Sequence, residues 1–168
     1  EAQVDQVLEQ IGGVRAKLGV AYRYWLFDYD PLPVIGVICA SGCVPDHKSH
    51  QYYPTPSELA EIAVAHASEG DNGDMLWLEP SAGQGGLARL MPADRTTCVE
   101  VSQLHCDILT AMGLSTECAD FLEWTPPSPV DRIVMNPPFS SGRWQAHVEH
   151  AAGMLADGGV LVAIVPSS

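Results

Sequence analysis

Short apolar or β-rich runs recur from residue 75 onward, at residues 75–78, 97–101, 115–119, 133–135 and 160–165. The runs are three to six residues long, and turn-forming residues or helical patterns separate them, which is typical of strands in a mostly parallel sheet. We therefore predict a doubly wound α/β core in which strands alternate with helices.

Helical spacing marks further segments. The apolar positions from Val4 to Leu18 recur every three or four residues, which predicts an amphipathic helix over residues 2–18 that stops at Gly19. Prolines precede a second helix that ends near Ser68, with Leu59, Ile62 and Ala63 expected on its buried face. Apolar-periodic residues 87–91 and the segment 144–155 predict two more helices.

The N-terminal third has a different pattern. Residues 22–27 alternate and are rich in aromatic side chains, residues 34–38 are β-branched and apolar, and residues 28–33 have the composition of a turn. We predict two strands around that turn. Together with the first helix they would form a small α+β appendage over residues 1–50, ahead of a core over residues 51–168.

Composition sets limits on the class of protein. The chain has 168 residues, 46% of them hydrophobic, which is enough for one core and an appendage. No run approaches the roughly 20 apolar residues of a membrane span, and no signal peptide is visible. Five cysteines, at positions 39, 43, 98, 106 and 118, are an odd number and scattered, so we expect reduced thiols and a cytoplasmic protein without a membrane partner.

The charge balance argues against a broad nucleic-acid-binding surface. With 8 Lys and Arg against 21 Asp and Glu, the formal net charge is −13, whereas proteins that bind DNA usually present a basic face. A local cleft, a missing segment or a partner subunit could still supply phosphate contacts. Arg143 and Lys48 are the nearest candidates, with solvated surface cations as the alternative for each.

The tetrapeptide Asn136-Pro137-Pro138-Phe139 follows the apolar run 133–135 directly. An exocyclic amine has its lone pair delocalised, and two acceptors, the Asn136 side-chain oxygen and the Pro137 carbonyl, would release that lone pair for attack on a methyl group. The prolines stiffen the loop, and Phe139 offers a face on which a planar base can stack. The alternative is a proline-rich turn after a buried strand.

A glycine-rich segment follows the first apolar run of the core, from Glu79 to Gly86. Strand, glycine turn and helix in this order predict a nucleotide-type cofactor site. Gly83-x-Gly85-x-x-Ala88 also satisfies the dinucleotide fingerprint, so a nicotinamide enzyme competes on this motif alone. Glu79 favours S-adenosylmethionine, because a carboxylate repels a pyrophosphate and suits the α-ammonium group of an amino-acid-bearing cofactor.

Two acidic positions extend this pattern. Glu100 ends the second run, 17 residues after Gly83, where an acid can accept hydrogen bonds from both ribose hydroxyls. Asp120 and Phe121 follow the third run, where Asp120 can accept from an adenine amino group and Phe121 can pack on the ring. Either acid by itself is typical of a solvated strand end, so the evidence lies in the order of the motifs.

At this point the chain resembles the class I S-adenosylmethionine-dependent methyltransferases, and within them the N6-adenine DNA methyltransferases with an NPPF motif. The resemblance covers residues 51–168. It implies a Rossmann-like, seven-stranded, mostly parallel sheet and a catalytic tetrapeptide at Asn136, Pro137, Pro138 and Phe139. The cofactor-binding residues that it implies are Tyr53, Thr55, Pro56, Glu79, Pro80, Ser81, Ala82, Gly83, Gly85, Glu100, Val101, Asp120, Phe121 and Asn136.

The resemblance implies direct methyl transfer from S-adenosylmethionine to the N6 amino group of adenine in DNA, with the base flipped out of the helix. Alternatives are RNA adenine, a protein glutamine amide, or a non-catalytic, cofactor-binding regulatory subunit. The helix predicted from Trp144 to Leu155 carries His147 and His150. Both could act as catalytic bases, but we read the pair as a polar helix face, because the product ammonium sheds its proton readily and this chemistry needs no base. Cys39, Cys43, His47 and His50 have the ligand types for zinc but irregular spacing, so we expect no metal.

The sequence departs from the family after the fifth strand pattern, at Pro166-Ser167-Ser168. The last two strands and a target-recognition part are missing. We therefore expect this segment to methylate DNA inefficiently by itself. Further C-terminal residues, a homo-oligomer or a partner subunit would complete it.

Overall fold

The computed structural model describes residues 2–18, 22–27, 30–41, 55–139 and 142–166. Its centre is a five-stranded sheet in the order β5-β4-β3-β6-β7, and every pair of neighbouring strands is parallel. The strands are β3 (Trp77–Pro80), β4 (Thr96–Glu100), β5 (Ser115–Cys118), β6 (Val130–Met135) and β7 (Leu155–Ala163). The predicted α/β fold and its strands are confirmed.

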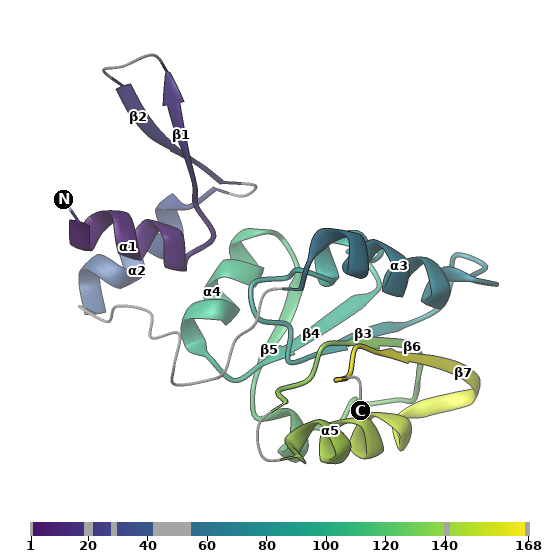
Figure 1. Ribbon diagram of the computed structural model, residues 1–168. Coiled ribbons are helices and arrows are strands. Elements are labelled where there is room, and N and C mark those ends of the chain that lie inside the picture. Colours follow the sequence, from purple (N-terminus) through teal and green to yellow (C-terminus); the bar gives the residue numbers. More distant parts are fainter. Residues whose placement is uncertain (1, 19–21, 28–29, 42–54, 140–141, 167–168) are drawn as a thin grey trace.

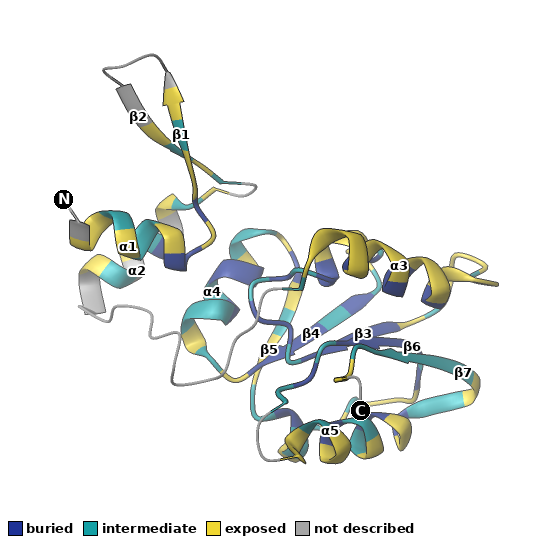
Figure 2. Ribbon diagram, in the orientation of Figure 1, coloured by how far each residue is buried: buried dark blue, intermediate teal, exposed yellow. Residues whose placement is uncertain are grey.

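Helices cover both faces of this sheet, as Figure 1 shows. Side chains alternate along each strand, so Trp77 and Val134 pack against the layer that contains α3, whereas Leu78 and Ile133 pack against the layer that contains α5. Figure 2 shows the resulting band of buried residues along the strands. The helices of this core are α3 (Ser57–Ser68), η1 (Ala88–Leu90), α4 (Gln103–Ala111), η2 (Phe121–Glu123) and α5 (Arg143–Ala152).

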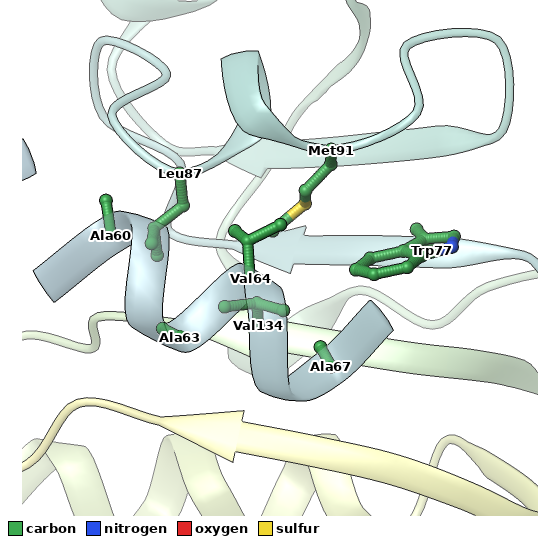
Figure 3. Packing of buried hydrophobic residues seen from close by; sticks show 8 residues of the cluster. All are labelled: Ala60, Ala63, Val64, Ala67, Trp77, Leu87, Met91 and Val134. Carbon is green, nitrogen blue, oxygen red and sulfur yellow. The ribbon is translucent and has the colours of Figure 1, made fainter. Parts of the chain in front are cut away.

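Helix α3 packs through small residues. Ala60, Ala63, Val64 and Ala67 recur at helical spacing and lie against a cluster completed by Trp77, Leu87, Met91 and Val134 (Figure 3). Small side chains let the helix approach the sheet closely, which is why they form the buried stripe. Of the three residues expected on this face, Ala63 is buried, but Leu59 and Ile62 are 38% and 56% exposed, so the prediction for those two was wrong.

The segment after the glycine loop is shorter than predicted. Instead of a helix over residues 87–91, the chain forms the single 3₁₀ turn η1. Pro92 explains the difference, because a proline disfavours helical geometry in the residue before it, and Met91 is extended with ψ 164°.

The N-terminal part contains α1 (Ala2–Gln10), a hairpin of β1 (Val14–Leu18) and β2 (Tyr22–Leu26), and α2 (Leu32–Ser41). The prediction of one helix over residues 2–18 was wrong beyond Gln10. Gly12 has a φ of 89°, and a Cβ at Gly13 would lie 2.7 Å from the Leu8 carbonyl oxygen. The glycine pair therefore ends the helix and starts the hairpin.

Residues 34–38 are helical, not a strand, so that prediction was wrong as well. Asp30 caps the start of α2 by accepting a hydrogen bond from the Leu32 N–H at 3.1 Å. Val34 is fully buried against Ile11 and Ile108. This packing outweighs the strand preference of β-branched residues.

Apolar packing and a hydrogen bond join the N-terminal part to the core. Ile11 and Val34 pack with Ile108 of α4, and the side-chain amide of Gln84 donates a hydrogen bond to the Gln10 carbonyl. The glycine loop that carries Gln84 therefore touches the N-terminal part directly. A domain boundary at residue 50 stays a prediction, since residues 42–54 lie outside the described part.

Cys39, Cys98, Cys106 and Cys118 are free thiols. Within the described residues, no group of three or more His, Cys, Asp or Glu side chains is placed to hold a metal. The zinc alternative involved Cys43, His47 and His50, which lie outside those residues. No described helix combines the length and apolar character that crossing a membrane requires.

Candidate functional site

A pocket opens at the carboxyl ends of the parallel strands. Glu79 and Glu100 reach it from the ends of β3 and β4, Asp120 lies just after β5, and Asn136 follows β6. In an open α/β sheet, ligands bind at this edge. The residues that line the pocket are Thr55, Glu79, Ser81, Ala82, Gly83, Gly86, Val99, Glu100, Val101, His105, Ala119, Asp120, Phe121, Asn136, Pro137, Pro138, Phe139, Arg143 and His147.

The glycine loop enters the pocket in left-handed conformations. Ser81, Gly83 and Gly85 have φ angles of 62°, 55° and 77°. The Gly83 N–H donates a hydrogen bond to Oε2 of Glu100 at 2.7 Å, which fixes the loop to β4. A Cβ at Gly85 would lie 3.1 Å from Leu109 Cδ2, so this glycine lets the loop pack on α4.

Glu100 is held as a carboxylate although it is only 6% exposed. Burial alone would raise its pKa, but the hydrogen bond from His105 and those from the backbone N–H groups of Ser102 and Gly83 outweigh it, so the pKa lies below its usual value. The Ser102 N–H donates to Oε1 at 2.9 Å, and His105 Nδ1 lies 3.6 Å from the same oxygen. A carboxylate has about four acceptor positions, and these three donors occupy three of them, so one position on Oε2 is left for a ribose hydroxyl.

The pKa of Glu79 is shifted in the opposite direction from that of Glu100. Its side chain is 3% exposed, and its Oε2 has no hydrogen-bond partner among the described residues. Burial raises the pKa of this carboxyl well above its usual value, and the charge of Glu100 adds to the effect, while the backbone N–H groups of Ala88 and Leu87 oppose it. A buried carboxylate in a pocket wall is stabilised by a cationic ligand.

Asp120 and Phe121 form the wall on the β5 side. Asp120 accepts a hydrogen bond from the Leu122 N–H at 3.0 Å and so begins η2. Phe121 is 3% exposed and packs into the cluster under α5 while one part of it lines the pocket. An acceptor beside an aromatic ring suits a planar base with an exocyclic amine.

The tetrapeptide lies along the opposite wall. The Asn136 amide nitrogen donates a hydrogen bond to Thr55 Oγ1 at 3.0 Å, which orients the amide plane. Pro137 is buried, and Phe139 is half-buried and lines the pocket. Because the Asn136 amide nitrogen is directed to Thr55, the carbonyl oxygen of the same side chain is the atom suited to accept a hydrogen bond from a substrate amine.

Three pocket residues were missed or set aside at the sequence level, and the prediction that His147 belongs to a polar helix face was wrong, because its side chain is buried at 5% exposure. His147 on α5 lies with Nδ1 3.3 Å from Ser81 Oγ and its ring centroid 5.5 Å from that of Phe121. Burial lowers the pKa of His147, and the positive charge of Arg143 adds to this, so the imidazole is neutral near pH 7. His105 and Arg143 also line the pocket. The spacing of Arg143 and His147, one helical turn apart just after the tetrapeptide, was the available signal.

Most of the predicted site residues meet in this one pocket. Pro56, Pro80 and Gly85 are not among the described residues that line it. Pro56 is the N-cap residue of α3, and Pro80 ends β3 in register with Val99. Tyr53 lies outside the described residues.

No protein-family model matches the chain, and no curated protein matches it. Solved structures do match. A provisionally assigned RNA methyltransferase from Pyrococcus horikoshii is 25% identical, with a TM-score of 0.60 over 80% of this chain and 72% of that one. A glycopeptide N-methyltransferase solved with S-adenosylmethionine is 14% identical, with a TM-score of 0.50 over 62% of this chain and 53% of that one.

An S-adenosylmethionine-dependent methyltransferase from Clostridium acetobutylicum is 16% identical, with a TM-score of 0.50 over 65% of this chain and 50% of that one. The chain thus spans 72% of the first of these structures and about half of the other two. At these identities the likeness concerns the fold, which is the Rossmann-like fold of class I methyltransferases.

Proposed function

We propose that the chain is an S-adenosylmethionine-dependent methyltransferase that methylates the N6 amino group of adenine in DNA. One observation carries the proposal. The glycine loop, Glu100, the Asp120-Phe121 pair and the tetrapeptide are far apart in the sequence, yet all of them line one pocket at the edge of the sheet where ligands bind.

The pocket fits the proposed cofactor. Oε2 of the buried Glu79 carboxyl has no hydrogen-bond partner among the described residues, and the α-ammonium group of S-adenosylmethionine would supply a positively charged donor for it. Glu100 would accept from a ribose hydroxyl, and Asp120 with Phe121 would hold the adenine. When bound, the cofactor supplies an electrophilic methyl group on a sulfonium.

The chain's own residues would prepare the amine that is methylated. The Asn136 carbonyl oxygen and the Pro137 carbonyl would each accept one N–H, which frees the nitrogen lone pair and stabilises the positive charge that develops there. Thr55 holds the Asn136 amide in place through the bond at 3.0 Å, so little reorganisation is needed. Phe139 would stack on the flipped base.

RNA adenine is the second candidate substrate. The similarity to a provisionally assigned RNA methyltransferase, which has the TM-score of 0.60, favours it. The same acceptor pair also suits the side-chain amide of a protein glutamine. A regulatory subunit would bind the cofactor through the glycine loop but would not transfer the methyl group.

A methylation assay with the full-length protein separates these functions. Labelled S-adenosylmethionine is offered together with an adenine-containing DNA duplex, the same sequence as RNA, and a glutamine peptide, and the products are digested and analysed by mass spectrometry. N6-methyladenine in DNA supports the proposal. Product in RNA or peptide alone reassigns the substrate, and cofactor binding without product indicates a regulatory subunit.

A further inference from the structure

The hairpin of β1 and β2 carries an unusual charge for this chain. Residues 14–27 contain three of the eight Lys and Arg residues and no Asp or Glu, although the whole chain has a formal net charge of −13. The hairpin points away from the sheet, as Figure 1 shows, and much of β1 is exposed in Figure 2. The exposed side chains of β1, among them Arg15 and Lys17, are therefore accessible to a partner.

The register places two cations on one side of the hairpin. Arg15 and Lys17 are two positions apart on β1, and Arg15 pairs directly with Trp25 of β2, so these three residues lie on the same face. The Arg15 guanidinium lies over the Trp25 ring, 5.8 Å from its centroid, and also contacts Asp5 at 2.6 Å. Lys17 is exposed. The face therefore combines positive charge with an aromatic surface.

The other basic residues of the core are placed differently. Arg95 is half-buried and held by Asp71 at 3.2 Å, Arg132 is 4% exposed, and Arg143 lines the pocket. Arg89 is exposed on η1. Within the part of the chain that the structure describes, the basic face of the hairpin is thus the place where cations gather at the surface.

The hairpin is also attached next to the pocket. Its base continues from α1, and the Gln10 carbonyl at the end of α1 accepts a hydrogen bond from Gln84 of the glycine loop. Gly12 approaches the same side chain, since a Cβ there would lie 3.2 Å from Gln84 Oε1. A ligand held on the hairpin is therefore held by an element that contacts the loop of the proposed cofactor site.

We propose that this basic face, formed by Arg15, Lys17 and Trp25, binds the phosphate backbone of the nucleic acid whose adenine enters the pocket. The inference rests on the proposed function for the identity of the nucleic acid. Phosphates supply the charge complementary to the cations, and Trp25 supplies a ring on which an unpaired base stacks. The face thus attracts phosphate groups locally, whereas the acidic remainder of the chain repels them.

Oligonucleotide binding tests the proposal. Fluorescein-labelled single-stranded and duplex DNA, and RNA of the same sequence, are titrated with the full chain between about 50 and 200 mM salt, where each phosphate contact lowers the slope of log K against log[salt] by about 0.7 to 0.9. Lys17→Gln should reduce the steepness of that slope by nearly one contact, and Arg15→Gln with Lys17→Gln by about two. Arg89→Gln, which removes an exposed cation from η1, is the matched control and should leave the slope unchanged.

Trp25→Ala should weaken single-strand binding roughly tenfold, and Trp25→Phe should restore most of it. Circular dichroism of each variant verifies that the fold is retained. Unchanged affinity and salt slope in the folded double variant, or an equal loss in Arg89→Gln, would overturn the inference, as would absence of oligonucleotide binding by the wild type.

Calorimetry with S-adenosylmethionine on the same samples keeps the two proposals distinguishable. If the chain binds S-adenosylmethionine and the hairpin variants bind oligonucleotide like the wild type, only the role of the hairpin is contradicted. Hairpin-dependent oligonucleotide binding without cofactor binding contradicts only the proposed function.

Discussion

Asn136 and Thr55 are joined by a hydrogen bond of 3.0 Å between the amide nitrogen and the hydroxyl, although 81 positions separate them. The bond ties the segment before α3 to the loop after β6. Because the Asn136 amide nitrogen is directed at Thr55, the amide oxygen is the atom suited to accept a hydrogen bond from a substrate.

Replacing Asn136 tests its proposed role in the chemistry. Asn136→Ala should lower turnover by on the order of a hundredfold or more, because one acceptor of a preorganised site is lost. Its affinity for S-adenosylmethionine should change far less. Asn72→Ala, on the exposed loop before β3, is the matched control. Methylation at the wild-type rate by Asn136→Ala would exclude the proposed mechanism.

Phe139 is predicted to act on the target base. Phe139→Ala should lose roughly 1–3 kcal/mol of target binding through the loss of stacking. Phe139→Tyr keeps a ring and should retain much of the activity. The measurement is the KM for an oligonucleotide at saturating cofactor, and an equal effect of Ala and Tyr would argue against stacking.

We predict that the buried Glu79 side chain lowers the stability of the folded chain and contributes to cofactor binding. Because burial raises its pKa, the folded state holds a proton more tightly than the unfolded state, and the free energy of unfolding falls as the pH rises from about 4.5 toward the raised value. Glu79→Gln lacks this ionisation, so the variant should be more stable than the wild type at neutral pH while binding S-adenosylmethionine more weakly.

Urea denaturation across this pH range gives the stability of Glu79→Gln, and calorimetry gives its affinity. Glu61→Gln, an exposed substitution on α3, is the control for both. A loss of stability in Glu79→Gln at neutral pH would show that Glu79 is not an isolated buried charge.

His147 is predicted to make stability depend on pH near neutrality. Its pKa is lowered by burial and by Arg143, so the unfolded state binds the proton more tightly, and stability should be lost as the pH falls below about 6.5. His147→Gln should show a smaller loss over that range. His66→Gln, whose side chain is 68% exposed in the wild type, is the control. A loss of the same size in His147→Gln and the wild type would contradict the assignment.

The core was predictable from the sequence because most of its strands are short apolar runs that end in residues with distinct chemistry, although β5, Ser-Thr-Glu-Cys, is polar and largely exposed. Glu100 and Asn136 could be placed at one edge of the sheet before their contacts were known. The N-terminal part was harder, because the strand preference of Val34 and Ile35 is weaker than the packing of α2 on Ile11 and Ile108. A local sequence pattern gives no information on such contacts between residues that are far apart in the chain.

The place of His147 in the pocket was not predicted, for a related reason. It depends on Ser81, 66 positions away in the chain, whose left-handed backbone brings the hydroxyl to 3.3 Å from Nδ1. The sequence places His147 one helical turn from Arg143 and from His150, but it carries no sign of Ser81 as a partner.

The most direct test of the central claim is calorimetric titration of the chain with S-adenosylmethionine and, separately, with NAD. The wild type should bind S-adenosylmethionine, and Glu100→Ala should weaken that binding by about 1–3 kcal/mol through loss of the acceptor for a ribose hydroxyl. Glu117→Ala, an exposed change on β5, should bind like the wild type. Absence of S-adenosylmethionine binding, or tight binding of NAD in its place, would contradict the account.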